Sequence, residues 1–148
     1  MERLIGLLQK MLGMKKNAPG EILFVYGSLK KGFMNHERFG LHNQKFLGSG
    51  EIPCYRMYSL RAYPCVVFTA DARDRITCEI YEVDRNTMDR IRYIEHGAGY
   101  KEQIIATPRR GVCNGRAGSI FVYDRKPEHA RIVESGVWQQ SDQTLYFR

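Results

Sequence analysis

The sequence lacks the cysteine and histidine spacings of a metal site. Its four cysteines, Cys54, Cys65, Cys78 and Cys113, lie 11, 13 and 35 residues apart, so no C-x-x-C pair exists. Structural zinc sites use closely spaced ligand pairs. The four histidines show no H-E-x-x-H spacing either. We therefore predict neither a metal site nor a metal cofactor.

Disulfide and membrane signals are also missing. Three of the cysteines lie inside or beside apolar, strand-like stretches, which is typical of reduced, buried thiols in a cytoplasmic protein rather than of a disulfide framework. No apolar segment approaches the roughly 20 residues that a membrane-spanning helix needs. We expect a cytoplasmic protein without a membrane span.

Long basic runs are absent although the net charge is +7, from 23 Lys and Arg against 16 Asp and Glu. The basic residues form only scattered pairs, such as Lys30-Lys31 and Arg109-Arg110, without the interleaved aromatics that stack bases. A nucleic-acid partner is considered because of the charge and is not expected. A generally basic surface that favours small anionic ligands fits the pattern better.

The 148 residues predict one domain, residues 21–148, preceded by a helix and linker over residues 1–20. Apolar residues recur at helical spacing over Met1–Met14, but Gln9-Lys10 interrupts them and no signal-peptide cleavage site follows. We expect this amphipathic helix to pack on the domain or on a second subunit, which would give a homodimer. A helix lying on a membrane surface is the alternative.

Short apolar or alternating segments dominate the domain and predict strands. They cover Ile22–Val25, Lys45–Leu60 as one or two strands broken at Gly48–Gly50 and Pro53, Tyr63–Phe68, Ile76–Val83, Tyr100–Thr107 and Ala117–Tyr123. Helices are predicted over Asn35–Asn43 and after Asp84, a good N-cap, with Gly97 as the stop signal. These elements indicate an α+β domain with a curled, largely antiparallel sheet.

The first strand breaks into the loop Tyr26–Gly32, which contains two glycines. Such a loop exposes backbone N–H groups to which an anionic ligand can bind closely. A nucleotide-binding P-loop is excluded because Phe33-Met34 replaces its Lys-Ser/Thr pair. Ser28 lacks a G-x-S-x-G context, so we interpret it as a hydrogen-bonding residue rather than a nucleophile.

Glu95 falls in the last turn of the helix that follows Asp84. A carboxylate there faces the negative end of the helix dipole, which should raise its pKa. A raised pKa suits a general base. The alternative is an exposed helix-end glutamate with no special role.

Together, the loop and Glu95 resemble the gamma-glutamylcyclotransferase-like family, most closely its gamma-glutamylamine cyclotransferase branch. The family signature Y-G-[ST]-L-[KR]-x-G-x-x-N-H is similar to Tyr26–Gly32 with Asn35-His36 behind it. Three further motifs follow in the family's order, covering Ala62–Pro64, Glu79–Asp84, and Met88 to Glu95 with Tyr100 after it. The resemblance extends over residues 21–138 and leaves the Arg125–Arg148 tail outside the shared core.

The resemblance implies a mixed six- or seven-stranded sheet that approaches a barrel, with the ligand pocket at its mouth. It also implies cyclisation of a gamma-glutamyl amine to 5-oxoproline with release of the amine. Glu95 would be the acid/base, Gly27, Ser28 and Leu29 would bind the glutamyl carboxylate or polarise the carbonyl, and Tyr26 and Tyr100 would line the pocket. No cofactor is implied.

Three positions depart from the family pattern. Cys78 and His96 replace glycines, and Glu102 replaces an arginine. An alternative follows from these departures: a catalytically silent module of the same fold that binds glutamyl compounds or other small carboxylates.

Overall fold

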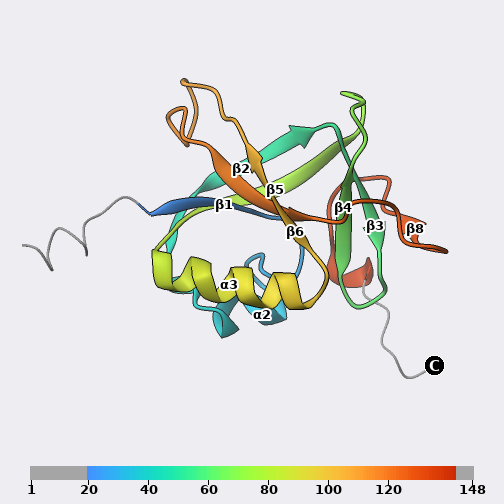
Figure 1. Ribbon diagram of the computed structural model, residues 1–148, viewed down its shortest axis with the longest axis horizontal. Coiled ribbons are helices and arrows are strands. Elements are labelled where there is room, and N and C mark those ends of the chain that lie inside the picture. The colour runs from blue at the N-terminus through green and yellow to red at the C-terminus, as the bar shows by residue number, and fades with distance from the viewer. Residues whose placement is uncertain (1–19, 143–148) are drawn as a thin grey trace, which may run out of the picture.

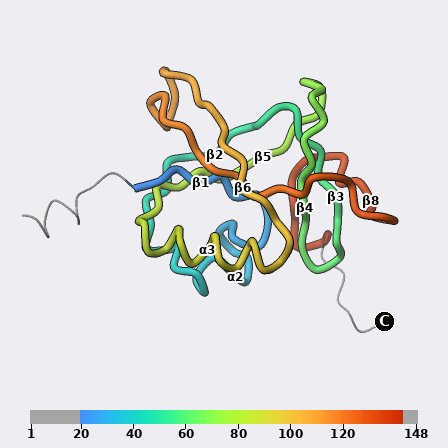
Figure 2. Tube along the Cα trace, viewed as in Figure 1, coloured from blue at the N-terminus to red at the C-terminus, as the bar shows by residue number. Residues whose placement is uncertain are grey.

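The computed structural model describes residues 20–142 (Figures 1 and 2). The predicted N-terminal helix, and the homodimer that depends on it, lie outside the described residues. The strands are β1 (Glu21–Val25), β2 (Lys45–Pro53), β3 (Tyr55–Ser59), β4 (Pro64–Phe68), β5 (Arg75–Val83), β6 (Lys101–Ile105), β7 (Gly118–Val122) and β8 (Arg131–Ile132). The helices are α2 (Met34–Arg38), α3 (Arg85–Gly97) and the 3₁₀ turns Leu41–Asn43 and Gln140–Asp142.

The described strands form two sheets. The larger has the order β2-β5-β1-β7-β6, in which only the β1–β7 pair is parallel, and the smaller has the order β4-β3-β8. A single parallel bridge, Val67 to Tyr123, joins them. The predicted α+β class with curled, largely antiparallel strands is confirmed. The strands form one sheet of five and one of three, because β4 pairs with the chain at the end of β7 only at this bridge.

Both faces of β1 are buried, as its uninterrupted apolar run predicts. Ile22 and Phe24 belong to one core cluster, whereas Leu23 and Val25 belong to the other. The side of Leu23 and Val25 packs against α3, and Figure 1 shows α2 and α3 together below the larger sheet. The last residue of β1 is therefore followed by a loop that lies beside the helices.

The predicted start of α3 is confirmed, since the Asp84 carboxylate accepts a hydrogen bond from the Thr87 N–H at 2.8 Å. The helix ends at the predicted Gly97, but a different glycine forms the cap. Gly97 is still helical, and Gly99 (φ +91°) terminates the helix. The N–H groups of Tyr100 and Gly99 donate to the carbonyls of Glu95 and His96, which is the Schellman pattern. The C′ position of this pattern, held here by Gly99, requires a left-handed backbone conformation.

The predicted strand break at Gly48–Gly50 is wrong. β2 continues through this segment with a bulge between Phe46 and Gly48, because pairing with β5 resumes on the far side. The predicted break at Pro53 is confirmed, since β2 ends there and Cys54, whose φ is +74°, separates it from β3. Pro64 begins β4 on the edge of the smaller sheet, a position that a proline can occupy.

Part of the segment after Arg125 packs into the hydrophobic core. Trp138 is fully buried in the cluster that contains Ile22 and Phe24. The N–H of Thr77 donates to the carbonyl of Gly136 at 2.9 Å, which ties this segment to β5. No helix within residues 20–142 is long and apolar enough to cross a bilayer.

Gly118 allows β7 to pack closely on β1, and replacing it should destabilise the domain. A Cβ at this position would lie 2.3 Å from the Phe24 ring and 2.7 Å from Ile22 Cγ2. We expect Gly118→Ala to lower the free energy of unfolding by about 1–3 kcal/mol through overpacking. Gly97→Ala is the control, because a Cβ there would meet no atom of residues 20–142 within 4 Å and alanine favours helix. Urea denaturation that gives equal stabilities for the two variants would contradict this expectation.

Candidate active site

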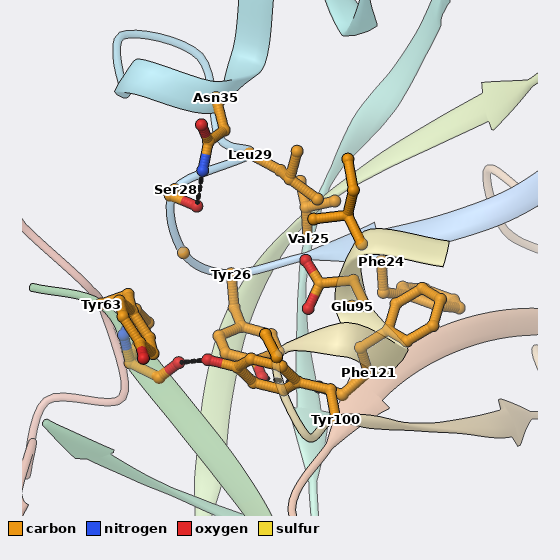
Figure 3. A pocket seen from close by; sticks show the side chains of 14 residues that line it. Phe24, Val25, Tyr26, Ser28, Leu29, Asn35, Tyr63, Glu95, Tyr100 and Phe121 are labelled. Atoms are coloured by element: carbon orange, nitrogen blue, oxygen red, sulfur yellow. Dashed lines mark hydrogen bonds between the residues drawn. The ribbon is translucent and has the colours of Figure 1, made fainter. Parts of the chain in front are cut away.

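All six predicted site residues line one cavity of about 210 Å³ at the end of β1 (Figure 3). Tyr26, Gly27, Ser28 and Leu29 form the side contributed by the loop, and Glu95 and Tyr100 come from the end of α3 and the residue before β6. The sequence reasoning did not single out Asn35, Ile94, Ala98 or Phe121 for this wall. It also missed four residues at the end of β1 and around the start of β4, namely Phe24, Val25, Tyr63 and Pro64.

Glu95 directs its carboxylate into the cavity, toward Val25 and Leu29 in Figure 3. No residue of the described chain makes a hydrogen bond or ion pair with this carboxylate. Burial raises its pKa from 4.5 to about 7. The predicted direction of the shift agrees with this value, and desolvation in a largely apolar pocket causes it.

The backbone N–H groups of Gly27, Ser28 and Leu29 have no hydrogen-bond acceptor among residues 20–142. The loop's carbonyls are engaged, however: Gly27 and Ser28 accept from the N–H groups of Lys30 and Asn35, both at 3.0 Å. A Cβ on Gly27 would lie 2.8 Å from Pro64 Cγ, so only glycine lets the loop approach β4 this closely. Three free donors thus share the cavity with one free carboxylate.

Side chains outside the cavity fix the loop. Buried His36 is hydrogen-bonded through Nδ1 to the Leu29 carbonyl at 2.8 Å, and Glu79 Oε1 accepts from the Lys31 N–H at 2.9 Å. The Lys30 ammonium donates to the Trp138 carbonyl at 2.7 Å. The C-terminal segment therefore supports the loop, a role that sequence reasoning missed because these two residues are 108 positions apart.

Tyr26 and Tyr100 serve as walls rather than as proton donors to a ligand. Their hydroxyls donate to the carbonyls of Phe121 at 2.6 Å and Pro64 at 2.7 Å. Burial raises the pKa of both phenols. Ser28 Oγ accepts from Asn35 Nδ2 at 2.9 Å, and no described histidine or carboxylate contacts it as a base.

The remaining candidates for chemistry are engaged in structure. All four cysteines are unpaired, and burial raises the pKa of the Cys65 and Cys78 thiols to about 12, which leaves them unreactive. Glu102 forms an ion pair with Arg92 and accepts from the Ser119 hydroxyl at 2.6 Å. Within residues 20–142, no group of three or more potential metal ligands gathers.

The comparisons with known proteins agree with this geometry. The family model described as gamma-glutamyl cyclotransferase, AIG2-like, matches residues 23–140. A relative from Methanocaldococcus jannaschii, provisionally named a gamma-glutamylcyclotransferase, is 44% identical over 118 residues, covering 78% of this chain and 93% of that protein. The gamma-glutamylcyclotransferase family protein YtfP of Escherichia coli K12 is 32% identical over 124 residues, covering 81% and 97%.

Solved structures show the same fold. The crystal structure of an uncharacterized protein from Pyrococcus horikoshii has a TM-score of 0.64 at 30% identity, covering 80% of this chain and 89% of that one. The solution structure of YtfP from Escherichia coli has a TM-score of 0.61 at 28% identity, covering 82% and 99%. With the loop, the helix-end glutamate and these relatives in agreement, the chain belongs to the AIG2-like gamma-glutamyl cyclotransferase family.

Proposed function

We propose that this protein converts a gamma-glutamyl amine to 5-oxoproline and a free amine, with Glu95 as the general acid/base. One observation carries the proposal. An unpartnered carboxylate with a pKa of about 7 shares a small cavity with the three free N–H groups of Gly27, Ser28 and Leu29. A base with that pKa can accept a proton near neutral pH and give it back.

In the proposed reaction, Glu95 takes a proton from the substrate's α-ammonium. The freed amine attacks the γ-carbonyl carbon of the same molecule and forms the ring C–N bond. The bond from that carbon to the leaving nitrogen then breaks as Glu95 returns the proton to this nitrogen. The ring nitrogen loses its second proton to the released amine, which departs as an ammonium ion. Atoms and charge balance without any further reactant, since the nucleophile and electrophile belong to one molecule.

The loop supplies the electrostatic part of the reaction. Its free N–H groups would bind the glutamyl carboxylate or the oxyanion that develops on the γ-carbonyl. Because His36, Glu79 and Trp138 hold the loop from outside, these donors are oriented before the substrate arrives. Tyr26 and Tyr100 exclude water from the reacting atoms.

The test is release of 5-oxoproline from a panel of gamma-glutamyl amides that includes gamma-glutamyl-ε-lysine. We expect turnover of at least one amide, and calorimetry should show that 5-oxoproline binds in the same cavity. Binding of glutamate or 5-oxoproline without turnover of any amide would instead support the silent binding module. The departures at Cys78, His96 and Glu102 motivate that second function.

A further inference from the structure

A second cavity, of about 260 Å³, adjoins the loop Tyr26–Gly32 on the side of Glu79. Its walls come from the loop and α2, from the 3₁₀ turn Leu41–Asn43, and from β2 and β5. It shares no lining residue with the cavity that contains Glu95. The reaction proposed above therefore leaves this second cavity without a role.

Buried His36 presents a free hydrogen-bond acceptor to this cavity. Its Nδ1 is bonded to the Leu29 carbonyl at 2.8 Å, and because a carbonyl oxygen only accepts, Nδ1 carries the proton. In the neutral ring Nε2 is therefore an acceptor, and it has no partner within residues 20–142. Trp138 Nε1 is the only side-chain nitrogen or oxygen of these residues that is both fully buried and unpartnered. His36 Nε2 thus remains accessible, through the cavity that His36 lines.

Glu79 adds a negative charge to the same cavity. Its Oε1 accepts from the Lys31 N–H and from the Tyr81 hydroxyl, both at 2.9 Å. Its Oε2 has no hydrogen-bond or ion-pair partner among residues 20–142. The two bonds to Oε1 orient the carboxylate before a ligand binds, which lowers the ordering cost of binding. A primary ammonium group has several N–H donors and can therefore donate to both Glu79 Oε2 and His36 Nε2.

Two basic side chains lie at the exposed edge of the cavity. Lys31 and His42 both line it and are exposed to solvent. Neither side chain has a hydrogen-bond or ion-pair partner in the described part of the chain, and Lys31 forms no ion pair with Glu79 although both line the cavity. The Lys31 ammonium and a ring N–H of His42 can therefore donate to a carboxylate. Opposite charges thus occur in one cavity without neutralising each other.

Apolar side chains complete the cavity. Leu41 is fully buried, and the Phe46 ring packs against the Tyr81 ring with the two centroids 5.4 Å apart. Phe46 nevertheless stays 55% exposed, so an aliphatic group that covers it would remove apolar surface from water. A metal ion does not fit here, because no group of three or more potential metal ligands gathers within residues 20–142. These walls fit an organic ligand that carries both charges and an apolar group.

We propose that this second cavity binds a free α-amino acid with a small apolar side chain. The ammonium of the ligand donates to Glu79 and His36. Its carboxylate accepts from Lys31 and His42, and its side chain covers Phe46. A ligand with only one of these charges leaves the opposite charge of the cavity unpaired. The site and its ligand are independent of the proposed function.

Three matched compounds test the charges of the ligand. L-leucine carries both charges, 3-methylbutylamine is the same molecule without the carboxylate, and 4-methylpentanoate is the same molecule without the ammonium. In calorimetry of the full chain near neutral pH, we expect L-leucine to bind at least about fivefold tighter than either analogue, because each analogue loses charged hydrogen bonds. Equal affinities, or no saturable binding of L-leucine in the millimolar range, would overturn the proposal.

Substitution of the edge lysine locates the ligand's carboxylate. Lys31→Met removes the ammonium and breaks no side-chain hydrogen bond or ion pair within residues 20–142, and we expect it to weaken L-leucine binding about fivefold. Lys45→Met is the matched control, because Lys45 is an exposed lysine that precedes Phe46 in β2 and does not line the cavity. Equal weakening by the two substitutions would assign the effect to general surface charge and contradict the proposal.

Glu79→Gln tests the other end of the ligand. Glutamine keeps an oxygen that can accept from the Lys31 N–H but removes the negative charge, so L-leucine binding should weaken at least about fivefold. Glu95→Gln separates the two cavities, since it alters only the first, and it should leave the affinity for L-leucine unchanged. If Glu79→Gln fails to fold, the comparison of Lys31→Met with its control still decides. No effect of a folded Glu79→Gln, or an equal effect of Glu95→Gln, would refute the second site.

Discussion

Glu95→Gln should lower kcat for the best gamma-glutamyl amide by about 10³-fold, within the 10²–10⁴ range that general acid–base catalysis contributes. Glutamine keeps the size and polarity of the side chain but cannot accept the α-ammonium proton. No described residue makes a hydrogen bond or ion pair with the Glu95 carboxylate, so the substitution breaks neither within that part of the chain. The lower kcat should therefore not result from a loss of folding stability.

The pH dependence of the unmutated enzyme gives a second measure of the same role. A general base works in its deprotonated form, so kcat/KM should rise with pH and level off above a pKa of about 7. Glu134→Gln, which neutralises an exposed glutamate outside the cavity, should leave both the rate and this profile unchanged. Glu95→Gln activity within threefold of the unmutated enzyme, or a flat profile between pH 6 and 8, would show that another group is the base.

The sequence predicts the local features of this site well because local rules govern them. The apolar run of β1, the glycine loop that follows it and the Asp84 cap each depend on a few neighbouring residues. These features place Glu95 in the last turn of α3. The family motifs then indicate that the loop and Glu95 share a pocket, and in the folded chain both line the same cavity.

Long-range contacts explain what the sequence could not predict. The packing of Pro64 against Gly27 and the hydrogen bond from Lys30 to the Trp138 carbonyl join segments with no shared local pattern. The burial that raises the pKa of Glu95 also depends on long-range contacts. The helix end is visible in the sequence, whereas the apolar surroundings contributed by β1, the loop and β7 appear only after folding.

That desolvated carboxylate should also make the stability of the domain depend on pH. The pKa of Glu95 is about 7 in the folded chain against 4.5 without burial. Between these values the folded state binds the proton more tightly than the unfolded state. The free energy of unfolding therefore falls as the pH rises from 4.5 through 7. At about 1.4 kcal/mol per pKa unit, the loss is on the order of 3 kcal/mol above pH 8.

Glu95→Gln removes this loss, because glutamine carries no charge at any pH. The variant should have nearly the stability of the unmutated protein at pH 4.5 and exceed it by about 3 kcal/mol at pH 8. Asp84 and Glu102, whose pKa values are lowered, act in the opposite direction at lower pH. They titrate alike in both proteins, so their contributions cancel in the difference.

Urea denaturation of both proteins from pH 4.5 to 8 measures that difference directly. A difference that grows with pH supports a buried, unpaired carboxylate, whereas a constant difference would mean that Glu95 is well solvated and cannot have a pKa near 7. We expect Glu95→Gln both to raise the stability and to abolish most of the turnover. This combination would mean that the ionised carboxylate proposed as the base is also the group that destabilises the fold at the pH where the enzyme works.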